Sequence, residues 1–242
     1  MREAIARRVD LMRRKRPEEA QGPGPKWLFR EPLAFLEPVT RPFRRTAALP
    51  RAEHPRVVML LPGFGTHPLR MRRMARELER AGHKVKRWGL GFNLGPTPEN
   101  FALLERRVRQ IGERYGQTVV LVGWSLGGIF ARELAKRHPE IVAKVVTMGT
   151  PFSGSPYANN AWRAYHWITG QDVAVPPIPG DYAAKPPVPT YALWSPRDGI
   201  VSPRAASGRP GERDEARALR CTHLGFASHP EVVTHVAELL GR

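Results

Sequence analysis

The sequence predicts an α/β fold with three layers, in which a mostly parallel sheet has helices on both faces. Three apolar runs rich in Val, Leu and Ile, at Val57–Leu61, Thr118–Val122 and Ile141–Met148, are typical of strands that are buried on both faces. Helical patterns separate these runs, at roughly 20–30 residues for each strand and helix. Strands joined in this way pair in parallel through right-handed crossovers. The 242 residues are enough for one substantial α/β domain.

The second apolar run leads into the sequence Gly123-Trp124-Ser125-Leu126-Gly127, and apolar residues then recur at helical spacing. This pattern predicts that Ser125 lies on a sharp, strained turn between a strand and a helix. Gly123 and Gly127 fit such a turn because the strand and the helix pass too close for side chains there. The helix N-terminus would then stabilise negative charge beside the Ser125 hydroxyl.

The remaining elements follow from local patterns. Thr97 followed by Pro98 is a typical helix start. Apolar periodicity and Gly or Pro breakers predict helices over Leu69–Ala81, 98–115 and Glu231–Leu240, and strands over Lys84–Leu90, Pro189–Trp194 and Ala216–Cys221.

The chain is expected to divide near residue 51. Residues 1–51 comprise a basic amphipathic helix over 1–16 and a Pro-rich segment whose apolar residues, such as Trp27, Val39 and Phe43, wrap the core. Residues 52–242 form the α/β domain. The helix is expected to pack on the domain or to form a basic tail, in preference to lying on a membrane, because its apolar face is thin.

Residues 152–189 interrupt the alternation of strands and helices after the strand that ends near Met148. Trp162, Tyr165 and Ile168 follow one another at intervals of three, which predicts one short helix. We interpret this insertion as a short cap over the site. The alternative is a surface excursion whose aromatic side chains pack on the sheet.

The composition is strongly basic, with 39 Lys and Arg against 22 Asp and Glu and a net charge of +17. Such a surface favours anionic partners, but the absence of any zinc-finger, RNP or KH pattern argues against nucleic acid. The apolar runs are shorter than the roughly 20 residues of a spanning helix. There is no apolar signal region, and Cys221 is the single cysteine, so we expect a cytoplasmic protein. Peripheral contact of residues 1–16 with an anionic membrane, and the oligomeric state, stay open.

The strand, the turn at Ser125 and the helix after it resemble the nucleophile elbow of the α/β-hydrolase superfamily. In that superfamily an acid and a histidine follow the serine in the chain, each on a loop after a strand. Ser195–Val201 is similar to the acid loop of bacterial lipases and esterases, and Thr222–Phe226 is similar to their histidine loop. The resemblance implies a three-layer α/β-hydrolase fold with Ser125, Asp198 and His223 as the catalytic triad.

Ser125 could instead be a structural turn residue, and the acid and the base each have alternatives in the sequence. Asp198 precedes Gly199 and could simply cap a turn, whereas Asp172, Asp181 and Asp214 follow no clear strand. Four histidines precede the acid and violate the chain order, and three others lie in the insertion or near the last helix: His54, His67, His83, His138, His166, His229 and His235.

The oxyanion of the reaction needs two backbone donors. The resemblance implies the amides of Leu126 and Phe64, although Pro62 stands where many lipases have a histidine. The predicted apolar substrate pocket is formed by Trp124, Phe152, Trp162 and Tyr165. A serine triad requires no cofactor, and no metal-binding motif is present in the sequence.

The sequence therefore predicts a hydrolase that cleaves a small-molecule or lipid ester through an acyl-enzyme on Ser125. An acyltransferase with the same acyl-enzyme is the second hypothesis. The third is a non-enzymatic basic scaffold that binds anionic membranes or nucleic acid.

Overall fold

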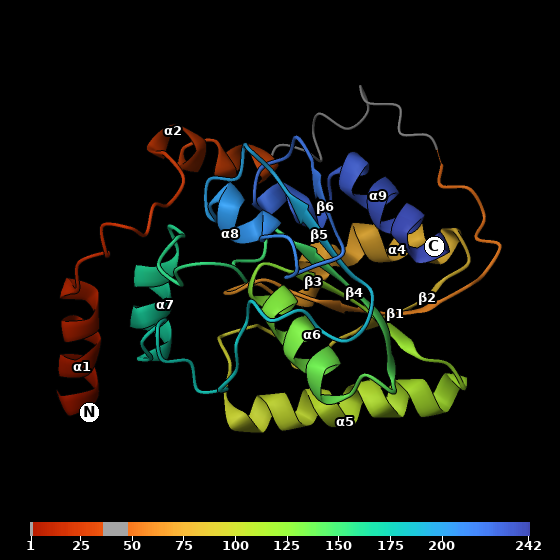
Figure 1. Cartoon of the computed structure of the whole chain (residues 1–242), viewed down its shortest axis with the longest axis horizontal. Helices are drawn as coiled ribbons and strands as arrows, with labels where there is room; N and C mark the ends of the chain where they lie inside the picture. The colour runs from red at the N-terminus through yellow and green to blue at the C-terminus, as the bar shows by residue number, and fades with distance from the viewer. Residues whose placement is uncertain (1, 36–47) are drawn as a thin grey trace.

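The computed structural model describes residues 2–35 and 48–242, with the side chain of residue 35 excepted. A sheet lies at the centre of the molecule and helices flank it (Figure 1). Val39 and Phe43, which the sequence assigns to the wrapping segment, lie outside the described residues.

Six strands form the sheet in the described part of the chain, in the order β2-β1-β3-β4-β5-β6. Every neighbouring pair is parallel. The strands are β1 (Val57–Leu61), β2 (Lys84–Arg87), β3 (Val119–Trp124), β4 (Val142–Met148), β5 (Thr190–Trp194) and β6 (Glu215–Ala218). The predicted mostly parallel sheet is confirmed, and β3 lies inside it between β1 and β4, so the residue that follows β3 lies at the middle of the sheet edge.

Helices cover both faces of this sheet, as predicted (Figure 1). Helices α4 (Arg72–Arg80) and α9 (Pro230–Gly241) pack on one face, and α5 (Pro98–Tyr115) and α6 (Leu126–Arg137) pack on the other. Val120 and Val122 belong to the core beneath α4 and α9, whereas Val119 and Leu121 belong to the core beneath α5 and α6. This alternation explains why β3 is an uninterrupted apolar run: both of its faces are buried.

The predicted element boundaries hold to within a few residues. Helix α5 begins as expected, because the Thr97 hydroxyl accepts from the Asn100 amide and the Asn100 side chain accepts in return from the Thr97 amide. The helix expected over Leu69–Ala81 is a 3₁₀ turn, Pro68–Met71, followed by α4. Strand β2 ends three residues before Leu90, and β6 ends three residues before Cys221.

The remaining helical elements belong to the N-terminal segment or to the loops after β4, β5 and β6. They are α1 (Arg2–Arg13), α2 (Pro25–Leu28), the 3₁₀ turn η1 (Glu31–Phe35), α7 (Trp162–Thr169), α8 (Pro203–Ser207) and the 3₁₀ turn η4 (Leu224–Ala227). Helix α1 lies beside α7 (Figure 1), and Leu11 is its one buried residue. Among the described residues, no helix is both long and apolar enough to cross a membrane.

Candidate active site

Ser125 sits between β3 and α6 in a backbone conformation that L-residues rarely adopt. Its φ is 54° and its ψ is −125°, and no other non-glycine residue of the described chain has a positive φ. A side chain at Gly123 would overlap the backbone of α6, and one at Gly127 would overlap the backbone at the end of β1. The strained turn and the close passage of strand and helix are therefore confirmed, and they present the Ser125 hydroxyl at the start of a helix.

Asp198 and His223 meet on the loops after β5 and β6. Asp198 Oδ2 lies 2.8 Å from His223 Nδ1, and both side chains are almost fully buried. Asp198 Oδ1 accepts hydrogen bonds from the amides of Ile200 and Val201, at 2.8 Å each. The same carboxylate thus shapes its own loop, as the turn-capping alternative predicts, and also faces the imidazole. A carboxylate at Nδ1 favours the tautomer whose Nε2 can accept a proton.

The surroundings of His223 raise the pKa of its imidazole. Burial alone lowers this pKa, but the charge of Asp198, its hydrogen bond to Nδ1 and the charge of Glu31 together outweigh burial. The imidazolium that would form on proton transfer is therefore stabilised where it stands.

Ser125 and His223 are linked through Trp124, the residue that precedes the serine. Trp124 Nε1 donates a 3.0 Å hydrogen bond to the carbonyl oxygen of His223, and the two rings are 5.9 Å apart between centroids. No hydrogen bond links Ser125 Oγ to His223 among the described residues. Hydrogen bonds between a nucleophile and its base are often long in unliganded enzymes and tighten when substrate binds.

The loop after β1 lies against Ser125 and carries one of the two predicted oxyanion donors. A Cβ at Gly63 would stand 3.2 Å from Ser125 Cβ. The Phe64 amide has no acceptor among the described residues, and Leu126 is the first residue of α6, where backbone donors lack intrahelical partners. Both amides are therefore available to a ligand.

Asn93 holds this loop, and the sequence analysis missed it. The side chain is fully buried; its Nδ2 donates to the Pro62 carbonyl at 2.8 Å, and its backbone carbonyl accepts from the Gly65 amide at 2.7 Å. Pro62 replaces a histidine that many lipases have, and Asn93 supplies a side-chain hydrogen bond at this turn. A polar residue 31 positions away in the chain gives no local signal of that role.

An apolar pocket opens at Ser125. Aromatic and aliphatic side chains from the loop after β1, from α6 and from the insertion line it: Phe64, Leu126, Ile129, Trp162, Tyr165 and Tyr182. The rings of Phe64 and Tyr165 are 5.3 Å apart, and burial raises the pKa of Tyr165 to about 12, so its hydroxyl is neutral at physiological pH. Trp162 and Tyr165, two of the predicted pocket residues, both line this cavity.

Trp124 and Phe152 are not among the residues that line this pocket, which corrects the predicted set. Trp124 belongs to the core beneath α4 and α9, where the His223 carbonyl satisfies its indole N–H. Phe152 packs against Ile129 and Ala192, with the guanidinium of Arg132 4.1 Å from its ring centroid. Trp124 adjoins Ser125 in the sequence, but this does not fix the face of the sheet on which its side chain lies.

Two sets of polar contacts hold the insertion between β4 and β5 in place, and the first comes from α6. Fully buried Arg132 on α6 donates to the carbonyl oxygens of Tyr182, Ala183 and Ala184, at 3.0–3.1 Å, and burial lowers the pKa of its guanidinium to about 10. The segment after α7 therefore packs directly on the helix that follows Ser125.

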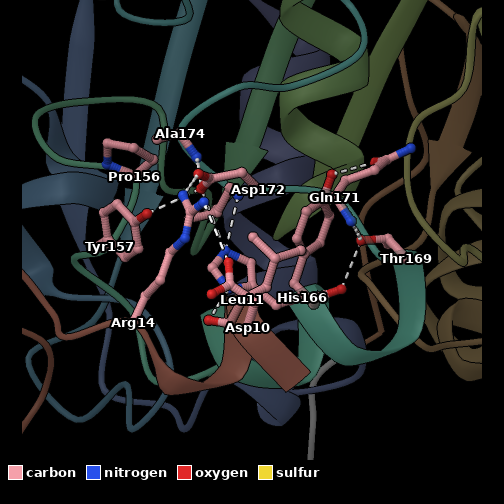
Figure 2. A network of polar contacts seen from close by, with 12 residues as sticks. Asp10, Leu11, Arg14, Pro156, Tyr157, His166, Thr169, Gln171, Asp172 and Ala174 are labelled. Atoms are coloured by element: carbon pink, nitrogen blue, oxygen red, sulfur yellow. Dashed lines mark hydrogen bonds and ion pairs between the residues drawn. The ribbon is translucent and has the colours of Figure 1, made fainter. Parts of the chain in front are cut away.

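A polar network fastens the other side of the insertion to α1 (Figure 2). Asp172 pairs with Arg14, accepts from the Tyr157 hydroxyl at 2.9 Å and lies 3.5 Å from His166. His166 Nδ1 lies 3.0 Å from the Leu11 carbonyl oxygen, and its Nε2 lies 3.0 Å from the Val173 amide. Asp172 and His166, set aside as triad members on sequence grounds, join α1 to α7.

Three backbone amides on the loops after β5 and β6 donate to the carboxylate of Glu31. These are the amides of Gly199, His223 and Leu224, each at 2.8 Å. Glu31 falls in the predicted wrapping segment, where no local pattern indicates a role for it. The described residues include no cluster of three or more His, Cys, Asp or Glu side chains arranged to hold a metal ion.

Comparison with known proteins agrees with this architecture. A family model described as the alpha/beta hydrolase fold matches residues 56–174. A pimeloyl-[acyl-carrier protein] methyl ester esterase of Aromatoleum aromaticum is 36% identical over 93 residues, which is 38% of this chain and 36% of that protein. A bifunctional biotin biosynthesis protein of Teredinibacter turnerae is 40% identical over 47 residues, 19% of this chain and 8% of that protein. The matches thus span only part of either relative.

Solved structures share the fold over most of the chain. The mature form of a Bacillus licheniformis lipase superposes with a TM-score of 0.59 and 18% identity, covering 78% of this chain and 94% of that one. A Paleococcus ferrophilus monoacylglycerol lipase gives a TM-score of 0.57 and 17% identity, covering 81% and 97%. With its parallel sheet, its serine elbow and the family match over residues 56–174, this chain has the α/β-hydrolase fold, and its fold resembles that of bacterial esterases and lipases.

Proposed function

We propose that this protein hydrolyses carboxylic esters through an acyl-enzyme on Ser125. The observation that carries the proposal is the buried Asp198–His223 pair, whose histidine is bound through its backbone to the residue beside the strained serine. A serine hydroxyl is a weak nucleophile at neutral pH, and such a pair supplies the base that activates it.

In the proposed reaction Ser125 Oγ attacks the ester carbonyl carbon while His223 Nε2 takes its proton. The carbonyl oxygen becomes an oxyanion, which accepts hydrogen bonds from the amides of Phe64 and Leu126. The tetrahedral intermediate collapses, and the imidazolium returns the proton to the departing alcohol. A water molecule then repeats these steps on the acyl-enzyme and releases the acid. Asp198 holds the imidazole in place and stabilises its positive charge without taking the proton.

The pocket favours an apolar acyl group. Its walls next to Ser125 are aromatic and aliphatic, and they offer little that would solvate a charged chain. We therefore propose small-molecule or lipid esters as substrates. A methyl ester belongs in any test panel, because one relative is named as a methyl ester esterase.

The test compares wild type, Ser125→Ala and Ser207→Ala on p-nitrophenyl and methyl esters of increasing acyl length. Ser207 lies on α8, does not line the pocket and serves as the matched control. We expect Ser125→Ala to lower kcat by at least about 10³-fold and Ser207→Ala to retain wild-type rates. An undiminished rate in Ser125→Ala would contradict the proposal. Product analysis with an added alcohol separates hydrolysis, which gives the acid, from acyl transfer, which gives a new ester.

A further inference from the structure

Glu31 lies on η1, far from the catalytic loops in sequence, yet its carboxylate lies between them. Its side chain is 4% exposed. Oε1 accepts from the amides of Gly199 and His223, and Oε2 accepts from the amide of Leu224, all at 2.8 Å. One carboxylate therefore binds the loop that carries Asp198 and the loop that carries His223.

Within the described residues, the hydrogen-bond partners of this carboxylate are all backbone amides. No Lys, Arg or His forms an ion pair with Glu31 within residues 2–35 and 48–242. A buried charge is costly unless hydrogen bonds satisfy it, and bonds from N–H groups to a carboxylate are among the stronger ones in proteins. The three amides are likewise buried donors that need an acceptor. The loops and the carboxylate thus depend on one another.

The three amide donors lie on the same loops as Asp198 and His223, so a displacement of either loop would move these two side chains apart. Gly199 directly follows Asp198, and the His223 amide belongs to the base itself. The acid loop also lies against α2, since a Cβ at Gly199 would come within 2.5 Å of the Trp27 carbonyl oxygen. One further bond joins the two loops: Ser195 Oγ donates to the Cys221 carbonyl at 2.5 Å. Both loops therefore rest on the N-terminal segment at the position of Glu31.

We propose that Glu31 is a positioning residue, which fixes the loop of Asp198 relative to the loop of His223 through these three amides. The inference rests on the proposed ester hydrolysis and deepens it. It also assigns residues outside the predicted domain of 52–242 to the working site, since without them the acid and base loops would lose their shared acceptor.

Because the charge of Glu31 acts on His223, the pKa of His223 can test the proposal. The charged groups around His223 are the carboxylates of Asp198 and Glu31 and the guanidinium of Arg70, which donates to the Leu224 carbonyl at 3.4 Å. The rings of Trp124 and Phe226 complete its surroundings, at 5.9 and 6.3 Å between centroids. Because the Glu31 charge favours the imidazolium, its removal should lower the pKa of His223. A purely structural support would leave that pKa unchanged.

The experiment uses Glu31→Gln, Glu31→Asp and a matched control, Asp214→Asn. The Gln variant keeps the shape but loses the charge and presents an NH₂ group to an amide donor. The Asp variant keeps the charge but is one methylene too short. Asp214 also accepts from a backbone amide, that of Thr190 at 2.8 Å, but at the start of β5, away from the catalytic loops. Histidine NMR titration gives the pKa of His223, assigned through a His223→Asn variant, and ester hydrolysis gives kcat and KM against pH.

We expect Glu31→Gln to lower the His223 pKa, to move the acidic limb of kcat/KM to lower pH, and to reduce kcat by about 10–100-fold with little change in KM. Glu31→Asp should reduce kcat while its acidic limb stays nearer that of the wild type. Asp214→Asn should match wild type in both measurements.

An unchanged His223 pKa in Glu31→Gln, or wild-type kcat in Glu31→Asp, would overturn the proposal. If Glu31→Gln does not fold, the Asp variant still decides through its kcat. Wild-type protein without Ser125-dependent hydrolysis would instead refute the proposed function, and the NMR titration would still decide whether Glu31 acts on His223.

Discussion

At the scale of residues, the site depends on a few side chains in unusual surroundings. Ser125 is held in a positive-φ conformation, and Asp198 and His223 are buried together. The sequence predicted these three from the elbow, the chain order and the two loop motifs. Asn93 and Glu31 escaped prediction because their partners are backbone groups of distant loops. Such contacts leave no periodicity or spacing in the chain.

Asp198→Asn should slow ester hydrolysis by about 10³–10⁴-fold, because an amide cannot stabilise the imidazolium and can orient the wrong tautomer. In wild type the pKa of His223 is raised above the ordinary value of about 6.5. Because the protonated ring accepts no proton, kcat/KM should begin to fall, as the pH is lowered, at a pH above that value. Loss of the Asp198 charge should move this limb to lower pH. The measurement is kcat/KM from pH 4 to 9, and an unshifted limb in Asp198→Asn would contradict the assignment.

At the scale of elements, the insertion forms one wall of the pocket and is anchored on two sides. Arg132 binds the segment after α7 to α6, and the Asp172 network binds α7 to α1 (Figure 2). The sequence predicted a short helix with Trp162 and Tyr165, and α7 confirms it. Ile168, the third residue of that pattern, is 45% exposed, because α7 turns only part of its surface towards the pocket.

Tyr165→Ala should enlarge the pocket and shift the preferred acyl group to longer chains. The Tyr165 ring packs against Phe64 in the pocket wall, so its loss opens space beside the acyl chain. Trp167→Ala is the matched control, because Trp167 lies on the same helix, is 50% exposed and does not line the pocket. The measurement is kcat/KM across the ester panel. The same optimum in Tyr165→Ala as in wild type would refute the assigned acyl pocket.

Arg14→Ala should loosen α1 from the insertion. Because the Arg14 side chain is exposed, the loss of this ion pair should lower the free energy of unfolding by only roughly 0–1 kcal/mol. Local opening is therefore the more sensitive measurement. We expect faster hydrogen exchange in α1 and α7 than in Arg13→Ala. Arg13 is a suitable control because it is exposed on α1 and forms no ion pair within the described residues. Equal exchange in the two variants would show that the Asp172 network does not hold α1.

At the scale of the whole molecule, the layered fold could be predicted from the sequence. Uninterrupted apolar runs such as Val119–Val122 predicted strands buried on both faces, and the helices between them predicted parallel pairing. The role of residues 2–35 could not be predicted from the sequence, because Leu11 and Glu31 act through contacts with α7 and with the loops after β5 and β6. The proposed division near residue 51 stays a prediction, and these contacts tie the first segment closely to the second.

The most direct test of the central claim is the site of attack by a fluorophosphonate probe, mapped by peptide mass spectrometry on wild type, Ser125→Ala and His223→Ala. The account predicts one adduct in wild type, on Ser125, no adduct in Ser125→Ala, and strongly slowed labelling in His223→Ala. An adduct on another residue, or labelling that survives in Ser125→Ala, would contradict it, as would a folded wild-type protein that takes no label.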